Sequence, residues 1–522
     1  MISTNMHQEA CMPHHNRVNF ITVLYYNLYI NFRGKNMACT TILVGKKASY
    51  DGSTIIARND DSPSGIFCAK KLVVINPKDQ PVVYKSKIGH LSMILPNKAM
   101  RYTATPSVDA THGIWAAAGI NEDNVAMTAT ETITTNDRVL AADPLVEYSP
   151  KKGNKPRQLG GIGEEDLVYI TLPYIHSAKE GVIRLGSLLE KYGTYESNGI
   201  AFSDKDEIWW LESIGGHHWI AKRVRDDSYI TMPNQFGLDE FDLEDAFNKQ
   251  KENLCSSDLK EFIDNNHLNL NKDNKFNPRL AFGSHSDSDH VYNTPRAWYI
   301  ERYFNPRTYV WDGENAKYTP ISDDIPWSMV PERKITISDV KYILSSHYQG
   351  TPYDPYARFG EDKQKGMYRP IGISRTDSLV LAQIRGYMPK DFMSIEWLAF
   401  GSNAFNAIVP LFPNVSKMPK YFSNTTNIAN TNNFYWSNRL IGALSDSHYQ
   451  FCSSLIENYQ ETIQSKGFEI IKKYEKIKDS KLFEKANNEI AKMVEEETNK
   501  LLDDVLYQAS CHMKNGYSKS DK

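Results

Sequence analysis

The chain has 522 residues, of which 41% are hydrophobic and 24% charged, so it can bury a large core in one large domain or in two to four smaller ones. Its formal net charge of −3 gives no basic surface for nucleic acid or for an anionic membrane. The six cysteines are irregularly spaced, without a Cys-x-x-Cys pair, and predict free thiols in a reducing cytoplasm with no metal or cofactor.

The first 36 residues differ in composition from the rest of the chain. Residues 20–32 form an aromatic, apolar run that is too short to span a bilayer and lacks the small-residue cleavage site of a secretory signal. Three explanations stay open: a removed propeptide, a membrane-directing segment, or upstream sequence translated from a wrong start, with Met37 as the true initiator. We therefore expect residues 1–38 to be a dispensable leader.

Residues 37–62 predict a tight hairpin. Residues 39–44 are β-branched and apolar, as in a short strand, and residues 54–57 form a similar returning strand. The polar segment between them has Asp51 and Gly52 at its tip, which is a typical turn pair. Since a hairpin brings its two ends together, residues about twenty positions apart should be close in space.

The ends of this hairpin contain a candidate active site, because its closure places Cys39 near Arg58, Asn59, Asp60 and Asp61. A thiol with a pKa of about 8.5 is mostly protonated at neutral pH, so a nucleophilic cysteine needs a cation or a base beside it. Arg58 can supply the positive charge, and Asp61 or Asp60 can hold the guanidinium or an ammonium group. If the chain is cut before Cys39, the α-amine of Cys39, with a pKa of about 7.7–8.0, can act as general base.

These residues also carry a resemblance to a known family. The run that begins at Cys39, the Asp51-Gly52 turn and the run from Arg58 to Asp61 resemble the start of the cysteine dipeptidases of the dipeptidase A type, which are N-terminal-nucleophile hydrolases. The Arg-x-x-Asp spacing is similar to that of the related penicillin V acylases and bile salt hydrolases. The resemblance implies a four-layer αββα sandwich, self-cleavage before Cys39 and hydrolysis of dipeptides without a metal.

Several elements are predicted after the hairpin. Residues 71–75 and 81–86 read as strands, and the apolar segments on either side of the turn at 119–124 predict a second hairpin in the same sheet as the first. In the acylase relatives this turn leads into a strand that ends in an asparagine of the oxyanion hole. The matching position here is Glu131, so its role stays open. Helices are predicted at 164–174 and 177–192, and strands at 199–203, 207–213 and 217–224.

Two later residues are candidate parts of the same site. A strand that breaks at Pro233 leaves Asn234 on a loop, where its amide N–H can stabilise an oxyanion, as an asparagine does in the acylase relatives. A turn-forming asparagine is the alternative. Arg296, at the helix start predicted within residues 291–298, matches a further family landmark and can brace the cluster by pairing with a carboxylate. The alternative is a surface arginine at a helix start.

The remaining chain predicts two strands followed by helices. Residues 374–384 and 395–401 have the apolar pattern of strands in a second central sheet. Residues 445–474 and 480–513 predict two helices that either cover the core or form an oligomer contact. The expected organisation is a leader at 1–38, a hydrolase domain at 39–435, C-terminal helices at 436–513 and a disordered tail at 514–522.

The sequence thus predicts an α/β (α+β) protein that hydrolyses small peptides through a thioester. Cys39 is the expected nucleophile, and the expected supporting residues are Arg58, Asp61, Asn234 and Arg296. No metal, cofactor, nucleic acid or membrane is expected to take part, and a homo-oligomer stays open. Two other functions stay open: an acylase for N-acyl amides of the penicillin V or bile-salt type, and a binding protein without catalysis.

Overall fold

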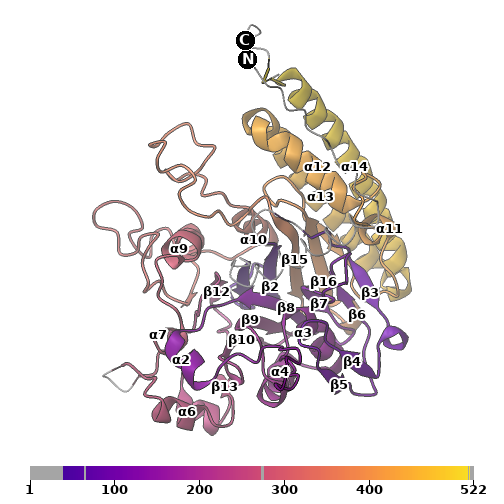
Figure 1. Cartoon of the computed structure of the whole chain (residues 1–522). Coiled ribbons are helices and arrows are strands. Elements are labelled where there is room, and N and C mark those ends of the chain that lie inside the picture. Colours follow the sequence, from indigo (N-terminus) through magenta and orange to yellow (C-terminus); the bar gives the residue numbers. More distant parts are fainter. Residues whose placement is uncertain (1–38, 64–65, 67, 272–274, 515, 518–522) are drawn as a thin grey trace, which may run out of the picture.

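The computed structural model of the protein describes residues 39–63, 66, 68–271, 275–514 and 516–517. The predicted leader, residues 1–38, and most of the predicted tail lie outside these residues. The mixed α/β class is confirmed, because two large antiparallel sheets are combined with long helices (Figure 1). In the described part of the chain, no helix combines the length and the apolar character needed to cross a membrane.

The first sheet has seven strands in the order β14-β12-β1-β2-β15-β16-β17. The predicted hairpin is confirmed as β1 and β2, with Gly52 in the turn at φ 85°, a conformation that glycine adopts without steric cost. The returning strand is longer than predicted and runs through Asp61. The strands are β1 Thr40–Val44, β2 Thr54–Asp61, β12 Tyr229–Met232, β14 Ser328–Met329, β15 Thr376–Ile384, β16 Ser394–Phe400 and β17 Val409–Leu411.

The second sheet has six strands in the order β13-β11-β10-β9-β8-β7. Its strands are β7 Ala118–Ile120, β8 Ala126–Thr132, β9 Asn198–Ser203, β10 Ile208–Ile214, β11 His218–Arg223 and β13 Asn253–Cys255. Two further pairs, β3 Val73–Ile75 with β6 Tyr102–Ala104 and β4 Val83–Lys85 with β5 Ser92–Ile94, form small sheets of their own. The predicted strands at 199–203, 207–213 and 217–224 are therefore confirmed.

The assignment of two segments to sheets was wrong. The hairpin around residues 119–124 consists of β7 and β8 and belongs to the six-stranded sheet, not to the sheet of β1 and β2. Conversely, β15 and β16 do not form a second sheet, because β15 pairs directly with β2. The pairing of β15 with β2 joins segments more than 300 residues apart, and local apolar patterns contain no information about such pairings.

Three hydrophobic cores fix the order of the layers. The core between the two large sheets contains Leu43 and Ile56 from the first sheet and Trp210 and Ile220 from the second. A second core packs the other face of the seven-stranded sheet against α9, α10 and α12–α14, and a third packs the other face of the six-stranded sheet against α3 and α4. The helices are α2 Asp137–Ala142, α3 Glu164–Thr171, α4 Ala178–Tyr192, α5 Leu243–Phe247, α6 Leu259–Asn265, α7 Pro278–Phe282, α8 Asp289–Tyr292, α9 Thr294–Phe304, α10 Ile337–Leu344, α11 Lys420–Ser423, α12 Phe434–Ser445, α13 Tyr449–Ile477 and α14 Phe483–Cys511.

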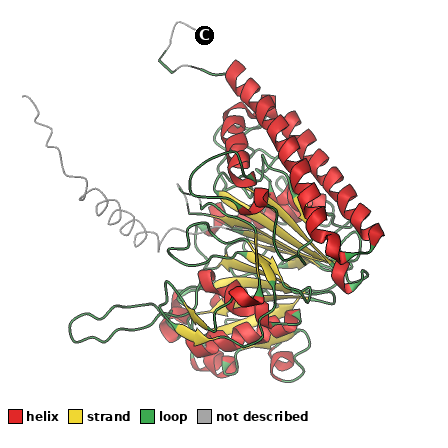
Figure 2. Cartoon of the chain, turned by 90° about the vertical axis from the view of Figure 1, so that its right-hand side faces the viewer, coloured by secondary structure: helices red, strands yellow, loops and turns green. Residues whose placement is uncertain are grey.

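The long C-terminal helices α13 and α14 lie side by side along one flank of the molecule (Figures 1 and 2). They are antiparallel, since Tyr459 contacts Thr498 at 2.8 Å while Lys473, further along α13, reaches back to Glu489 at 2.7 Å. Their apolar faces are buried in the core beside the seven-stranded sheet. Of the two alternatives that the sequence leaves open for these helices, the one in which they cover the core is confirmed.

Candidate active site

The alternation of side chains along β1 and β2 decides which residues lie beside Cys39. In the hairpin, Thr41 is opposite Arg58, and side chains two residues apart along a strand point to the same face. Cys39 and Thr41 therefore share a face with Arg58 and Asp60. The contacts of Thr41 and Arg58 with β8 show that this face points toward the six-stranded sheet.

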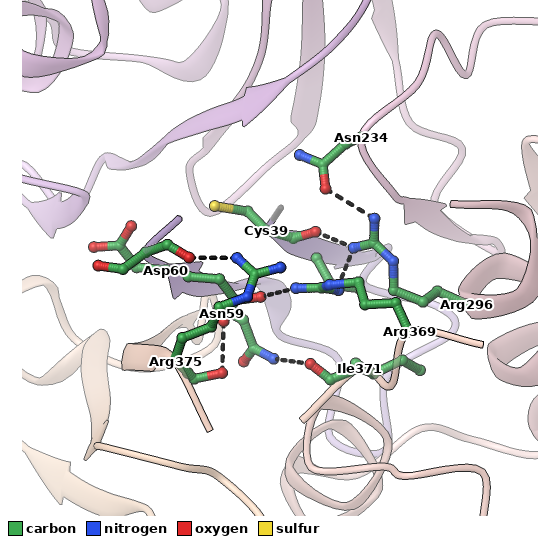
Figure 3. Close-up of polar contacts among 12 residues, drawn as sticks. Cys39, Asn59, Asp60, Asn234, Arg296, Arg369, Ile371 and Arg375 are labelled. Carbon is green, nitrogen blue, oxygen red and sulfur yellow. Dashed lines mark hydrogen bonds and ion pairs between the residues drawn. The ribbon is translucent and has the colours of Figure 1, made fainter. Parts of the chain in front are cut away.

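Arg58 contacts the thiol directly. Its Nη2 donates to the sulfur of Cys39 at 2.9 Å and also approaches carboxylate oxygens of Glu164 at 2.8 Å and Asp60 at 3.3 Å. Its Nε donates to the carbonyl oxygen of Thr130 at 2.5 Å. All these side chains are buried, so the guanidinium is held in one position by three polar groups besides the sulfur. Figure 3 shows Asp60 below the sulfur of Cys39.

The charges around Cys39 are arranged in a network. Asp60 pairs with Lys70 at 2.7 Å as well as with Arg58, and although burial opposes ionisation, these two cations hold the pKa of Asp60 below its usual value. Burial raises the pKa of the Cys39 thiol well above its usual value, and Arg58 only partly offsets this effect. Arg58 alone therefore does not make the buried thiol a thiolate, and a base is also required.

Glu131 is a third buried carboxyl group beside Cys39, after Asp60 and Glu164. It lies on β8, accepts a hydrogen bond from the Thr41 hydroxyl at 2.7 Å with one oxygen, and has no hydrogen-bond partner for the other within the described chain. Burial raises the pKa of Glu131 to about 8, in spite of the nearby Arg296 and Arg58. This carboxyl group bridges the two sheets next to the thiol.

Asp61 contacts a different arginine from the one that the Arg-x-x-Asp spacing suggested. Its carboxylate forms an ion pair with Arg369 and accepts a hydrogen bond from Thr376 at 2.5 Å (Figure 3 shows Arg369). Its neighbour Asn59 also points away from the Cys39 face and donates to the carbonyl oxygen of Leu344 at 2.8 Å. The side-chain partners of Asp61 are thus Arg369 and Thr376, whereas Asp60 contacts Arg58 itself.

Arg296 links the start of β1 to Asn234. It lies in the first turn of α9, as predicted, and its Nη1 donates to the Cys39 carbonyl oxygen and to the Thr40 hydroxyl, the latter at 2.7 Å. Its Nη2 donates to the side-chain oxygen of Asn234 at 2.8 Å and to that of Asn293 at 2.7 Å. The expectation of a carboxylate partner was wrong, because the acceptors that surround this buried arginine are carbonyl, hydroxyl and amide oxygens.

Asn234 is held at both ends of its side-chain amide. The oxygen accepts from Arg296, and one N–H donates to the carbonyl oxygen of Thr132 at 3.0 Å. The second N–H of the amide has no protein acceptor among the described residues. Figure 3 shows the amide nitrogen of Asn234 on the same side as the Cys39 sulfur. The amide therefore keeps one donor for a group bound next to the thiol.

The structure adds residues that the sequence did not single out. Glu164, Lys70 and Arg369 contact Arg58, Asp60 and Asp61, respectively, and the sequence does not identify these partners. Asn403, in the loop after β16, donates to the side-chain oxygen of Asn59 at 2.6 Å. No local signal identifies these partners, because Glu164, Arg369 and Asn403 each lie more than 100 residues from the group they contact, and the fold brings them there.

Comparison with known proteins identifies the family of this chain. The family model for peptidase family C69 matches residues 38–462. The chain is 52% identical over 532 residues to a dipeptidase of Bifidobacterium longum (strain NCC 2705), covering 93% of this chain and all of that protein. It is 50% identical over 489 residues to a probable dipeptidase A of Streptococcus pyogenes serotype M3 (strain SSI-1), covering 93% of this chain and all of that protein. It is 46% identical over 430 residues to dipeptidase A of Lactobacillus helveticus, covering 82% of this chain and 86% of that protein. The chain therefore belongs to peptidase family C69 and is a peptidase.

Proposed function

We propose that this protein is a cysteine dipeptidase that cleaves dipeptides through a thioester on Cys39. The observation that carries the proposal is the 2.9 Å contact between Arg58 and the Cys39 sulfur inside a buried, hydrogen-bonded cluster. The names of the relatives, which are dipeptidases and probable dipeptidases, support the choice of substrate. The family-level resemblance of the cluster supports the choice of nucleophile.

The first step requires a free amino group on Cys39. A peptide nitrogen is not basic because its lone pair is delocalised, so the bond between Ala38 and Cys39 must be broken before this nitrogen can accept the thiol proton. Attack of the Cys39 thiol on the carbonyl of Ala38 would break that bond by transferring the preceding acyl chain from nitrogen to sulfur, and water would then hydrolyse the resulting thioester, which frees the thiol and releases the leader with a carboxyl group at Ala38. The released amine then takes the proton that the buried thiol does not lose by itself, and Arg58 stabilises the thiolate that forms.

The chemical cycle then has two halves. The thiolate attacks the peptide carbonyl, and the tetrahedral intermediate collapses as the ammonium gives its proton to the leaving amine, which leaves an acyl thioester on Cys39. Water, deprotonated by the same amine, then attacks the thioester. This releases the N-terminal amino acid of the dipeptide and regenerates the thiol. Each half moves one proton onto the amine and one proton off it, so the enzyme returns to its starting state.

Asn234 and Arg296 have separate roles in this proposal. The free N–H of Asn234 stabilises the oxyanion of each tetrahedral intermediate. Arg296 is a positioning residue, because it holds both the Asn234 oxygen and the carbonyl oxygen of Cys39 and so fixes the donor relative to the nucleophile. Asp61 is proposed as a further positioning residue, which holds Arg369 and Thr376 beside the hairpin.

The fold, the domain bounds and the cellular location that we propose are those expected from the sequence. We assign the layers to the four-layer αββα sandwich of N-terminal-nucleophile hydrolases, an assignment that the core between the two sheets and the two outer helical cores support. The hydrolase domain is proposed to span 39–435 and to be followed by a helical extension at 436–513. A cytoplasmic location suits a thiol enzyme, because the reducing compartment keeps the nucleophile free.

A substrate panel tests the proposal directly. Purified protein should hydrolyse members of a dipeptide library and leave penicillin V and conjugated bile salts intact, and Cys39→Ala should abolish the dipeptide activity. Hydrolysis of the N-acyl amides alone would assign an acylase instead. If the protein cleaved neither class, it would be a binding protein, and if Cys39→Ala remained active the thioester mechanism would be wrong.

A further inference from the structure

A large cavity adjoins the segment that runs past the Cys39 cluster. Its volume is about 890 Å³, and it is lined by aromatic and apolar side chains, such as Phe405 and Tyr356, together with a few polar groups. The segment 372–375 forms part of its wall. The same segment is joined to the end of the catalytic hairpin, because the backbone N–H of Ser62 donates to the carbonyl oxygen of Arg375 at 3.0 Å. Arg375 therefore lies both in the wall of the cavity and beside the end of the catalytic hairpin.

Arg375 differs from the other buried arginines in its partners. Arg58, Arg369 and Arg385 each form an ion pair with at least one carboxylate, and Arg296 has five hydrogen-bond acceptors around it. Arg375 is only 8% exposed, yet among the described residues its guanidinium donates to a single group, the carbonyl oxygen of Ser62, and forms no ion pair. Since a buried charge is costly unless it is paired, this guanidinium lacks an anion.

Charged groups of the cluster act on this cation, which is drawn together with Cys39 in the close-up of Figure 3. The negative charges of Asp61 and of an ionised Cys39 both act on the Arg375 guanidinium, although burial and the neighbouring Arg369 have the opposite effect and lower its pKa overall. The Asp61 carboxylate is already occupied by Arg369 and Thr376. In the view of Figure 3, Arg375 lies on the opposite side of Cys39 from Asn234.

We infer that Arg375 binds the α-carboxylate of the substrate. In a dipeptide this carboxylate is three bonds from the carbonyl carbon that Cys39 attacks, so its anchor must lie on a wall next to the nucleophile. A planar guanidinium can bind a carboxylate through two parallel hydrogen bonds, which fixes both the position and the orientation of the leaving amino acid. This inference rests on the proposed dipeptidase function and gives a reason for the preference for dipeptides. A longer peptide has a neutral amide at this place and leaves the arginine unpaired.

The test compares matched substrates with matched variants. The substrates are a dipeptide that the enzyme cleaves, the same dipeptide with a C-terminal amide, and the tripeptide with one more residue at the C-terminus. Where the amide or the tripeptide is not turned over, it is measured as a competitive inhibitor. The variants are Arg375→Gln, Arg375→Lys and the control Arg358→Gln, which removes an exposed positive charge.

Arg375→Gln should lower kcat/KM for the free dipeptide by roughly 30-fold or more, mainly through KM, because one partner of a buried charge pair is removed. It should change the amide and the tripeptide by much less, so that the preference for the dipeptide falls. Arg375→Lys keeps the charge and should fold even where Arg375→Gln does not, and its smaller loss should also be confined to the free carboxylate. Arg358→Gln should behave as wild type with all three substrates.

An equal loss on the dipeptide and its amide, or no loss on either, would overturn the inference and leave Arg375 with a structural role. These outcomes presuppose that the wild-type enzyme cleaves dipeptides. If it cleaves none, the proposed function itself fails, and the two failures are distinguished by the wild-type assay alone.

Discussion

The Nη2 of Arg58 lies 2.9 Å from the sulfur of Cys39, and the two residues stand on the same face of the β1–β2 hairpin. This contact follows from strand alternation and needs no long-range coincidence. The other partners of the guanidinium are distant in the sequence. Glu164 from α3 and Thr130 from β8 hold it from other layers of the fold. A local hairpin thus supplies the pair, and the folded domain fixes its geometry.

The first prediction concerns the nucleophile. Cys39→Ala should reduce dipeptide hydrolysis to background, a loss of more than about 10⁴-fold, because no other group can form the acyl intermediate. Replacement of exposed Cys68 or Cys511 by serine should leave kcat/KM within about twofold, since surface substitutions are usually nearly neutral. Activity assays of the three purified variants test this prediction. If the serine variant of Cys68 or of Cys511 lost all activity, Cys39 would not be the nucleophile.

The second prediction distinguishes the effect of the positive charge of Arg58 from the effect of the several hydrogen bonds that its guanidinium donates. Arg58→Lys keeps a cation but cannot donate to all the present acceptors at once, so kcat should fall by up to about 10²-fold through misplacement of the thiolate. Its pH–rate profile should shift to higher pH, because a weaker cation contact leaves the thiol harder to ionise.

Arg58→Ala should behave differently from Arg58→Lys. It leaves Glu164 and Asp60 buried without this partner and should also destabilise the protein by about 3–5 kcal/mol in denaturant unfolding. If Arg58→Lys had a normal kcat and an unshifted pH profile, Arg58 would be structural only.

Much of the site was predictable because it is local. The hairpin, Cys39 at its start and Arg58 near its end were all recognisable from a thiol, a turn and two β-branched runs. Asp61 shows the limit of this reasoning. A spacing of three residues places it on the opposite strand face from Arg58, and only the fold reveals that Arg369, 308 residues away, is its partner.

The sheets show the same limit on a larger scale. The sequence identified most strands as strands, since alternation and β-branched residues are local signals. It assigned the hairpin of β7 and β8 and the strands β15 and β16 to the wrong sheets, because pairing partners are chosen by burial across the whole domain. The helices α13 and α14 were easier, since their break at Lys478 and their apolar faces lie within one continuous stretch.

The third prediction tests Asn234 as an oxyanion donor. Asn234→Ala should lower kcat by about 10²–10³-fold with a smaller change in KM, as expected when a donor acts mainly in the transition state. The matched variant Asn234→Asp retains an oxygen acceptor for Arg296 and removes the N–H donors. It should lose as much kcat as the alanine variant. Recovery of activity in Asn234→Asp would show that the residue serves only to hold Arg296.

The fourth prediction uses the buried carboxyl group of Glu131. Burial raises its pKa from 4.5 to about 8, so between these pH values the folded protein holds a proton that the unfolded chain has released. The folded state binds more protons there, and this group therefore makes the protein less stable as pH rises from about 4.5 to 8.

Glu131→Gln is neutral at every pH and removes this effect. The Tm of the variant minus the Tm of wild type should therefore become more positive between pH 5 and pH 8. The exposed control Glu496→Gln should give a flat difference over the same range. A flat difference for Glu131→Gln as well would mean that this carboxyl group is ionised in the folded protein throughout the range.

The account depends most on one chemical event, the appearance of Cys39 as an amino terminus. Its decisive measurement is peptide mapping by mass spectrometry of active enzyme treated with iodoacetamide until activity is lost. We predict that the N-terminal peptide begins at Cys39 and that alkylation of this residue parallels inactivation, because amine and thiol belong to the same residue. Fully active enzyme in which Ala38 is still joined to Cys39, or inactivation that parallels alkylation of another cysteine, would contradict the mechanism.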